Sequence, residues 1–201
     1  SQADYFQTVK GGGHGDYRLI TLAPASVQEM ADFVALGFDL AFKYNNPAII
    51  LADGIIGQMM EKVVLPPFRP RRTEEEIRKQ MPWATQGKLA GHKRNVITSL
   101  ELDPAIMEEN NIRFQAKYRK IEEAEVRYEE IGCENADYLM IAFGSMARIC
   151  LKTQEMALAE GIKVGVLRPI TLWPFPSKII AEYANKVKGM ISVELNAGQM
   201  V

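Results

Sequence analysis

Short, almost wholly apolar runs that alternate with amphipathic helical patterns constrain this chain more than any other feature. Three of these runs have the sequences PAIILAD (residues 47–53), DYLMIAFGS (137–145) and IKVGVLRPI (162–170). Runs of this kind are typical of strands that are buried on both faces of a parallel sheet. Their alternation with helical segments predicts an α/β fold over 201 residues.

The first block contains one strand-helix-strand unit. Residues 17–23 alternate apolar and β-branched side chains and end at Pro24, which predicts a strand. Ser26 followed by Glu29 predicts a capping box, so a helix is expected from there to Asn45. The strand at 47–53 completes a right-handed βαβ unit. Two strands are too few for a stable sheet, so this core is expected to need a further segment or a partner.

The middle of the chain changes character. Residues 66–94 contain four prolines, mixed charge and no sustained period, which predicts a long connector. Its basic side chains could bind a phosphate, but a solvated arm that packs on a partner explains them as well; they are Arg69, Arg71, Arg72, Lys88, Lys93 and Arg94. A long, highly charged surface helix is predicted over 103–131, with Pro104 in its first turn and Gly132 past its end.

A second block starts near residue 136. The strand at 137–145 is followed by a helix to Gly161, the strand at 162–170, a proline-rich turn (LWPFP), a helix over 176–189 and a strand over 190–196. This order predicts a small parallel sheet covered by helices. The expected organisation is a partial first domain (1–65), a connector with a long helix (66–135) and an incomplete second domain (136–201).

Composition excludes several classes of protein. There are 24 Lys and Arg against 25 Asp and Glu, so the net charge of -1 gives no reason to expect nucleic acid as a partner. No apolar run is long enough to cross a bilayer, and no membrane partner is expected, which makes the cytoplasm the expected location. Cys133 and Cys150 are too isolated for a redox pair or a cluster site and are expected in the core. No set of metal ligands is visible.

Three features at the ends of predicted strands are candidates for binding. Gly144 and Ser145 lie at a strand-to-helix junction, where main-chain N–H groups and the helix dipole favour an anion. Arg168 ends the next strand, at the edge where open α/β sheets present ligands and interfaces. For these residues a capped helix start and a domain interface are weighed ahead of a ligand. Asp53 and Gly54 are explained by a tight turn, although they could also hold a ligand.

The sequence GGGHGD at residues 11–16 is the other candidate. It precedes a strand, whereas phosphates are held at helix N-termini, so it is not a phosphate cradle. The imidazole of His14 could approach a substrate closely in a loop of glycines and take part in acid-base chemistry. The alternative is a flexible joint, because glycines need only mean positive φ or close approach of the backbone.

The order of these segments resembles a known family. The stretch from SQADYFQTVKGGGHGD to ADGIIGQMME resembles the end of the pyrimidine-binding domain in the α subunit of 2-oxoacid:ferredoxin oxidoreductases, particularly the 2-ketoisovalerate and 2-oxoglutarate types. The stretch ADYLMIAFGSMARICLKTQEMALAEGIKVGVLRPITLWPFP, continuing to MISVELNAGQM, is similar to a transketolase C-terminal-like domain. The resemblance covers nearly the whole chain and implies a piece of a longer polypeptide.

The resemblance implies an enzyme that decarboxylates a 2-oxoacid, passes electrons to ferredoxin and transfers the acyl group to coenzyme A. Thiamine pyrophosphate and Mg would be shared with a β subunit that carries the diphosphate site, and iron-sulfur clusters would lie on other subunits. Further partners would be a γ subunit and a ferredoxin-like subunit. The family's catalytic glutamate has no match in this chain, so the chain alone is expected to bind no cofactor. The implied contacts on the substrate or coenzyme side are Gln2, Asp4 and His14.

Two alternatives remain open from the sequence. The second domain is common to thiamine enzymes, so a transketolase or a 2-oxoacid dehydrogenase β-type subunit is one of them. A non-catalytic α/β interaction module is the other. The sequence does not identify the 2-oxoacid, the role of His14 or the oligomeric state.

Overall fold

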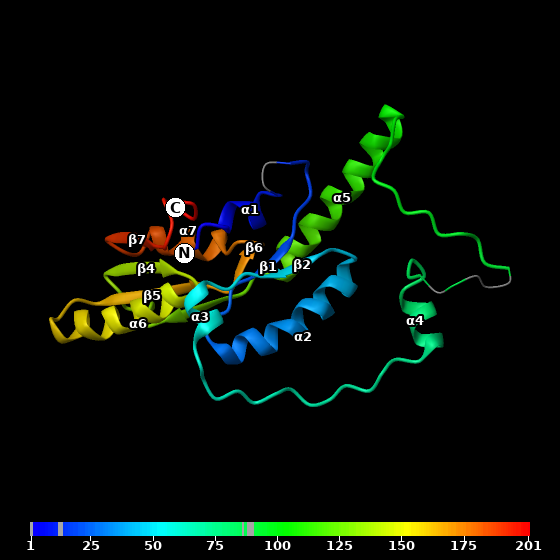
Figure 1. Cartoon of the computed structure of the whole chain (residues 1–201). Helices are drawn as coiled ribbons and strands as arrows, with labels where there is room; N and C mark the ends of the chain where they lie inside the picture. Colours follow the sequence, from blue (N-terminus) through cyan, green and yellow to red (C-terminus); the bar gives the residue numbers. More distant parts are fainter. Residues whose placement is uncertain (1, 12–13, 86, 88–90) are drawn as a thin grey trace. The chain divides into compact units, whose positions relative to one another are not determined.

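The computed structural model describes residues 2–11, 14–85, 87 and 91–201, and it divides into two compact units (Figure 1). The body unit comprises Ser1–Leu65 and Tyr118–Val201, and the connector unit comprises Pro66–Lys117. The body unit contains α1 (Tyr5–Val9), β1 (Ile20–Leu22), α2 (Val27–Tyr44), β2 (Ala48–Ile50), α3 (Gly54–Gln58), β3 (Tyr128–Ile131), β4 (Tyr138–Ala142), α6 (Gly144–Ala159), β5 (Val164–Pro169), β6 (Thr171–Trp173), α7 (Ser177–Ala184) and β7 (Gly189–Val193).

The first sheet of the body unit has the strand order β2-β1-β6. Strand β1 pairs in parallel with β2, as a βαβ unit requires, and Ile20 lies opposite Ala48. Strand β6 pairs antiparallel with β1, so residues of the second sequence block complete the first sheet. These residues were expected to form a turn. The prediction of a turn is wrong at Leu172 and Trp173, which belong to β6 and are buried in the core. The chain turns only after them.

Helix α2 covers this sheet and begins and ends where the sequence predicts. The main-chain N–H of Glu29 donates to Ser26 Oγ at 3.1 Å, and Asn45 ends the helix in the left-handed conformation. The capping box is not reciprocal, because Glu29 accepts from Ala25 N at 2.7 Å instead of from Ser26 N. The core beneath combines residues from both sequence blocks: Tyr5, Val9, Ile20, Leu22, Phe33, Leu40, Tyr118, Ile121, Phe143, Leu172 and Trp173.

The second sheet has the order β3-β5-β4-β7. Strand β4 is parallel to β5 and to β7, as predicted, whereas β3 is antiparallel to β5. The helix expected over 103–131 is therefore too long: α5 (Pro104–Ala124) ends before β3. Tertiary partners override helical propensity here, because the carboxylates of Glu129 and Glu130 bond across the fold to Arg168 and Tyr183.

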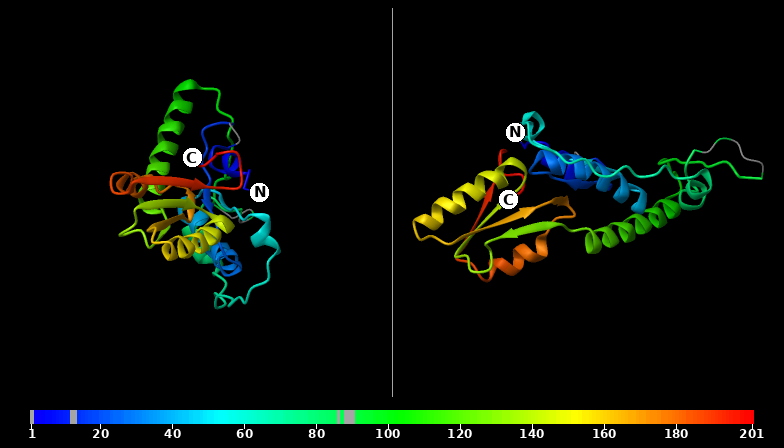
Figure 2. Two further views of the ribbon diagram at one scale, coloured as in Figure 1. Left: turned by 90° about the vertical axis from the view of Figure 1, so that its left-hand side faces the viewer. Right: turned by 90° about the horizontal axis from the view of Figure 1, so that it is seen from below.

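The two faces of the second sheet carry different helices. Alternate side chains point to opposite faces: Met140, Ala142 and Val166 pack with α6, whereas Leu139, Ile141 and Leu167 pack with residues of α7. Figure 2 shows α6 and α7 on opposite sides of this sheet. Cys133 and Cys150 are buried in these two clusters, as expected for small core residues.

The connector unit contains α4 (Glu74–Gln80) and most of α5. Helix α4 was not predicted, although its N-terminus is a full capping box in which Thr73 and Glu76 bond reciprocally. The threonine and the glutamate three residues later are the signal that could have revealed it. Among the described residues, no helix has the length and apolar character needed to cross a membrane.

Candidate functional site

The carboxyl ends of three strands meet at one junction in the body unit. Asp53 follows β2, Gly144 and Ser145 follow β4, and the segment from Glu194 onward follows β7. The first residues of the chain lie at the same junction, since the Gln2 main-chain N–H donates to Leu195 O at 3.1 Å. The carboxyl edge is where open α/β sheets present ligands and interfaces.

Asp53 forms hydrogen bonds with two of the segments that meet at this junction. Its Oδ1 accepts hydrogen bonds from the main-chain N–H groups of Ile55 and Ile56, both at 3.2 Å, which caps α3. Its Oδ2 accepts from Ser145 N at 2.8 Å and so caps α6, whose own N-cap residue is Phe143 and has no capping side chain. One carboxylate therefore stabilises the positive ends of two helices.

The pKa of Asp53 reflects this position. Burial raises the pKa of the carboxyl, but the hydrogen bonds from Ser145, Ile56 and Gln2 outweigh burial and hold the pKa below its ordinary value. The side chain is 7% exposed, so an ionised carboxylate is kept in the interior by main-chain and amide donors. The sequence left a tight turn and a ligand site open for this residue. It follows β2 and caps two helices, and it uses its oxygens within the chain.

Gln2 is buried beside Asp53 and uses its whole side-chain amide within the chain. Its Nε2 donates to Phe143 O at 2.9 Å and to Asp53 Oδ2 at 3.4 Å, while its Oε1 accepts from Leu195 N at 3.1 Å. The Gln2 side chain thus joins the first residues of the chain to the start of α6 and to the segment after β7. The structure places it in the framework of the junction.

Gly144 is required by this close packing. Its φ is +59°, and a Cβ there would lie 2.7 Å from Asp53 Oδ2 and 2.9 Å from Gln2 Nε2. Only glycine meets both demands without strain. The helix start at Gly144 and Ser145, which was weighed ahead of a ligand site, is capped by the carboxylate of Asp53 in the same chain. Ser145 Oγ is buried without a hydrogen-bond partner.

The segment after β7 clasps the first residues of the chain. Gln199 Oε1 accepts from Phe6 N and Gln199 Nε2 donates to Ala3 O, both at 2.9 Å, and Asn196 Nδ2 donates to Gln2 O at 3.1 Å. Burial, with a smaller contribution from the charge of Glu194, raises the pKa of Tyr5 to about 12. These contacts between the two ends of the chain were not predicted from the sequence. A run of polar residues directly after an apolar strand was their signal.

A hollow of about 400 Å³ lies next to the N-terminal segment. Its lining residues are Asp4, Gln7, Thr8, Gly11, Tyr17, Leu19, Ile49 and Leu51. Of the sequence-predicted residues, Asp4 lies on this wall. His14 is exposed on the loop beside Gly11, and its main-chain N–H donates to Gly11 O at 3.0 Å. The Tyr17 hydroxyl donates to the same carbonyl at 3.0 Å and holds the loop. Gly12 and Gly13 of this loop lie outside the described residues.

Arg168 does not line the hollow, and its buried guanidinium forms ion pairs with two glutamates. Its Nη2 donates to Glu29 at the start of α2, and its Nη1 donates to Glu129 of β3 at 2.7 Å. Its Nε is buried without a hydrogen-bond partner. Arg168 thus joins β5 to α2 and to β3 within the body unit, and its role at a domain interface or an anion site stays a prediction.

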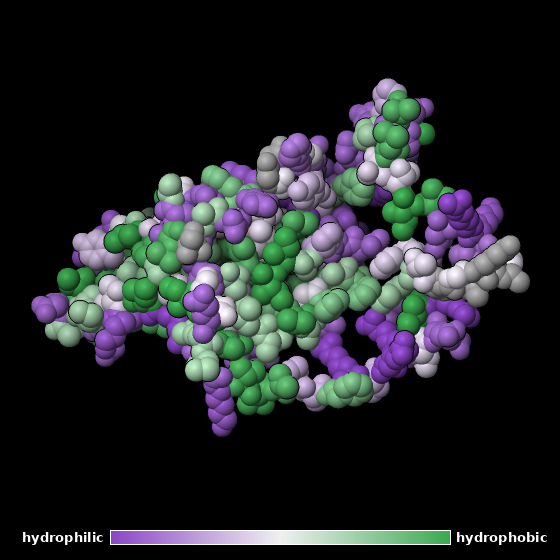
Figure 3. All heavy atoms as spheres, viewed as in Figure 1, coloured by the Kyte–Doolittle hydropathy of each residue, from purple (hydrophilic) through white to green (hydrophobic). Residues whose placement is uncertain are grey.

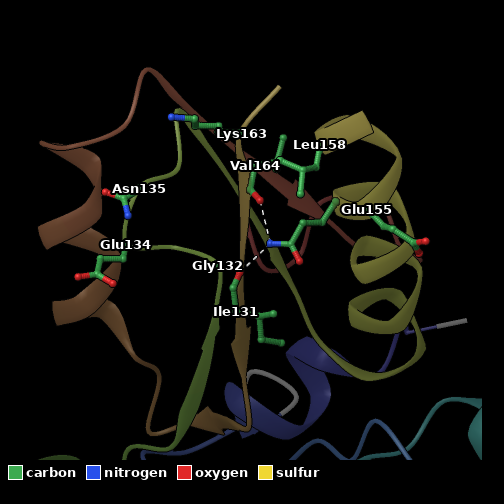
Figure 4. A pocket seen from close by; sticks show the side chains of 9 residues that line it. Ile131, Gly132, Glu134, Asn135, Glu155, Leu158, Lys163 and Val164 are labelled. Atoms are coloured by element: carbon green, nitrogen blue, oxygen red, sulfur yellow. Dashed lines mark hydrogen bonds between the residues drawn. The ribbon is translucent and has the colours of Figure 1, made fainter. Parts of the chain in front are cut away.

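A second hollow, of about 660 Å³, lies at the other end of the second sheet (Figure 4). Glu134 and Asn135 line one side, and Glu155 and Leu158 of α6 line another. Gln154 Nε2 donates to Ile131 O and Val164 O, both at 2.8 Å, and so ties two strands to α6. The rim of this hollow carries both acidic and basic side chains, so it does not indicate which kind of ligand would bind there.

Comparison with family models decides the membership. Residues 1–132 match the model described as pyruvate flavodoxin/ferredoxin oxidoreductase, thiamine diphosphate-binding, which is more than half of the chain. The chain belongs to this oxidoreductase family. Residues 136–201 match a second model, pyruvate:ferredoxin oxidoreductase core domain II. The family resemblance inferred from the sequence is thereby confirmed.

Individual relatives agree with the family. The chain is 50% identical over 199 residues to ketoisovalerate oxidoreductase subunit VorB of Methanothermobacter marburgensis, covering 99% of this chain and 55% of that protein. It is 32% identical to 2-oxoglutarate synthase subunit KorA of Archaeoglobus fulgidus, covering 100% of this chain and 56% of that protein. The chain thus spans just over half the length of these relatives.

A solved structure shares the fold. It is a 2-oxoglutarate:ferredoxin oxidoreductase from Magnetococcus marinus, with a TM-score of 0.74 at 24% identity, and the match covers 100% of this chain and 39% of that chain. At this identity the likeness supports the fold of the oxidoreductase chain. The predicted α/β class is confirmed.

The described residues of this oxidoreductase chain do not by themselves fit thiamine diphosphate. A diphosphate needs free main-chain donors, cations or a metal ion. The α6 N-terminus is filled by Asp53, and Arg168 is neutralised by two glutamates. Within the described part of the chain, no group of three or more His, Cys, Asp or Glu could hold a metal ion.

Proposed function

We propose that this chain is part of the α subunit of an enzyme that oxidatively decarboxylates a branched-chain 2-oxoacid such as 2-ketoisovalerate. The observation that carries the proposal is the 50% identity to a ketoisovalerate oxidoreductase subunit, maintained over 99% of the chain. The identity to the 2-oxoglutarate synthase subunit is lower, at 32%. This difference favours a branched aliphatic side chain on the substrate over a second carboxylate.

The proposed reaction balances in carbon and electrons. The 2-oxoacid loses its carboxylate as CO₂, its acyl group is transferred to the sulfur of coenzyme A, and two electrons leave to ferredoxin, with release of a proton. Thiamine diphosphate would supply the carbanion chemistry. The matched relative structure contains 2-oxoglutarate, coenzyme A and succinyl-CoA, which supports an acyl-CoA product.

In this proposal the chain contributes framework and one wall of the site. Gln2 and Asp53 would fix the N-terminal segment, so that Asp4 and His14 face substrate or coenzyme. A β subunit would bind the diphosphate and Mg, and a γ subunit and a ferredoxin-like subunit would complete a cytoplasmic assembly with the iron-sulfur clusters. The names of the relatives, which call them subunits, support a hetero-oligomer. Residues 1–65, 66–135 and 136–201 would be its three successive parts.

The test is to purify the full-length protein from its source with its copurifying chains. Reduction of ferredoxin is then measured with 2-ketoisovalerate and with 2-oxoglutarate, each with and without coenzyme A. We expect CoA-dependent reduction with the branched acid and a kcat/KM at least about tenfold higher than with 2-oxoglutarate. A preparation without thiamine diphosphate or iron-sulfur protein would contradict the proposal, and thiamine-dependent activity without CoA or ferredoxin would favour a transketolase or dehydrogenase relative.

A further inference from the structure

An extended segment of the connector unit has the pattern of a strand but pairs with no strand in the described part of the chain. Residues 95–103 have the sequence NVITSLELD, in which Val96, Thr98, Leu100 and Leu102 alternate with mostly polar residues. Alternation of this kind is typical of a strand with one buried face. Among the described residues, no hydrogen bond between main-chain groups involves residues 96–102.

The apolar side chains of this segment are almost fully exposed. The exposed fractions are 73% for Val96, 71% for Leu100 and 84% for Leu102. Figure 3 shows hydrophobic atoms, in green, along the extended segment that leads into α5. Contiguous exposed apolar surface of this kind marks an interaction site. We call Val96, Leu100 and Leu102 the connector strip.

The body unit carries a matching exposed ridge. Val34, Phe38 and Phe42 of α2 recur every four residues and are 48%, 63% and 41% exposed. The rings of Phe38 and Phe42 are stacked, with centroids 6.4 Å apart. We call these three residues the α2 ridge. The same helix carries the exposed carboxylates of Asp32 and Asp39.

Charge complements this apolar match. The connector unit has ten Lys and Arg against seven Asp and Glu, and the body unit has 14 against 18. The basic pair Lys93 and Arg94 lies directly before the connector strip, whereas acidic residues accompany the α2 ridge. Opposite net charges of the two units, with a basic pair next to the strip and two acidic residues on the helix of the ridge, favour association of the two surfaces.

We propose that the connector strip of one copy of this chain packs on the α2 ridge of a second copy, and the reverse, in a twofold pair. Because each copy carries both surfaces, a closed dimer forms the contact between strip and ridge twice, and neither surface then remains exposed. The pairing is independent of the reaction that the oxidoreductase catalyses. Its failure would leave the proposed activity untouched.

Cross-linking in the full-length subunit tests which chain the strip contacts. One tagged copy carries K93R, so that of these two lysines it keeps only Lys43 beside the ridge, and a differently tagged copy carries K43R, so that of the two it keeps only Lys93. The doubly tagged dimer is isolated and treated with an amine cross-linker. A link between Lys93 and Lys43 is expected and can only join two copies. Its absence, with Lys93 linked within its own copy or to another subunit, overturns the proposal.

Self-association provides the second test. L100S combined with L102S should weaken dimerisation of the full-length subunit by at least about tenfold, measured by analytical ultracentrifugation. I149S with M156S, at exposed positions of α6, is the matched control and should change nothing. K93E with R94E should also weaken the dimer, and adding D32K with D39K should restore it. Unchanged association in the strip variant overturns the proposal, and unchanged thermal unfolding confirms that the chain remains folded.

Discussion

The carboxylate of Asp53 accepts a hydrogen bond at 2.8 Å from the main-chain N–H of Ser145, 92 positions further along the chain. This bond links the carboxyl end of β2 in the first sheet to the helix that follows β4 in the second sheet. The two family-model segments of the chain are therefore joined by a buried charge and not only by apolar contacts. A buried carboxylate that loses its donors is strongly destabilising, so the link is sensitive to substitution.

Substitution of Asp53 by Asn tests this link. The amide keeps the shape but replaces a charged acceptor and presents a donor to the N–H groups of two helices, so the free energy of unfolding should fall by about 2 kcal/mol. Urea unfolding of the full-length protein measures the loss. D16N, at an exposed aspartate of the glycine loop, is the control and should stay within about 0.5 kcal/mol of wild type. Equal stability of the two variants would contradict the double cap.

The Asp53 link should also depend on pH. The pKa of Asp53 is lower in the folded protein than its ordinary value of 3.8, so its contribution is fully present above that value and is lost as the pH falls through the folded pKa. The stability difference between wild type and D53N should therefore be constant from pH 7 to about pH 5 and shrink in more acidic solution. A difference that grows on acidification would mean that the pKa is raised instead.

Gly144→Ala isolates the close approach of this junction. The new Cβ would meet Asp53 Oδ2 at 2.7 Å and would also force alanine into positive φ. Gly161→Ala is the matched control, because Gly161 has φ +76° and a Cβ added there would meet no atom within 4 Å. Positive φ alone costs about 1 kcal/mol, so G144A should lose at least about 1 kcal/mol more than G161A in urea unfolding. Equal losses would show that the junction relaxes freely.

The sequence predicted the parts of the fold that depend on local pattern. The apolar strands β2, β4 and β5 and the caps of α2 follow from short-range chemistry, and the structure has them. Strand β6 could not be predicted because it joins β1, about 150 residues away in the sequence, and the prolines after it favoured a turn. Strand β3 was taken for helix for the same reason, since its pairing with β5 is non-local.

The candidate site was predictable only in part. Strand ends drew attention to Gly144, Ser145 and Arg168, and all three lie at contacts between distant segments. Their partners within the chain are Asp53, Glu29 and Glu129, and no local pattern pairs residues that far apart. The same limit applies to Gln2, whose amide is fully used by groups more than fifty positions away.

Replacement of Arg168 should lower the free energy of unfolding of the protein. In R168M the carboxylates of Glu29 and Glu129 lose their common cation, and Glu29 is 22% exposed. Breaking a buried pair in this way costs about 3 kcal/mol, measured by urea unfolding. The double variant R168M/E29Q should recover part of the loss because the stranded charge is gone. If the loss in the double variant equals the sum of the losses in R168M and E29Q measured separately, the two side chains do not interact.

His14→Ala tests whether the glycine loop does more than join two segments. His14 is exposed on the loop beside the hollow that Asp4 and Gly11 line, and under the proposed function its imidazole faces bound substrate or coenzyme. We expect kcat/KM of the full-length complex to fall at least about tenfold, since a positioned histidine contributes at least that much to proton transfer. The control is His92→Ala, because His92 is the other histidine of the chain and is exposed in the connector unit. CoA-dependent turnover that is equal in both variants would make the loop a joint. A loss confined to His14→Ala, with unchanged thermal unfolding, would assign its side chain to the active site.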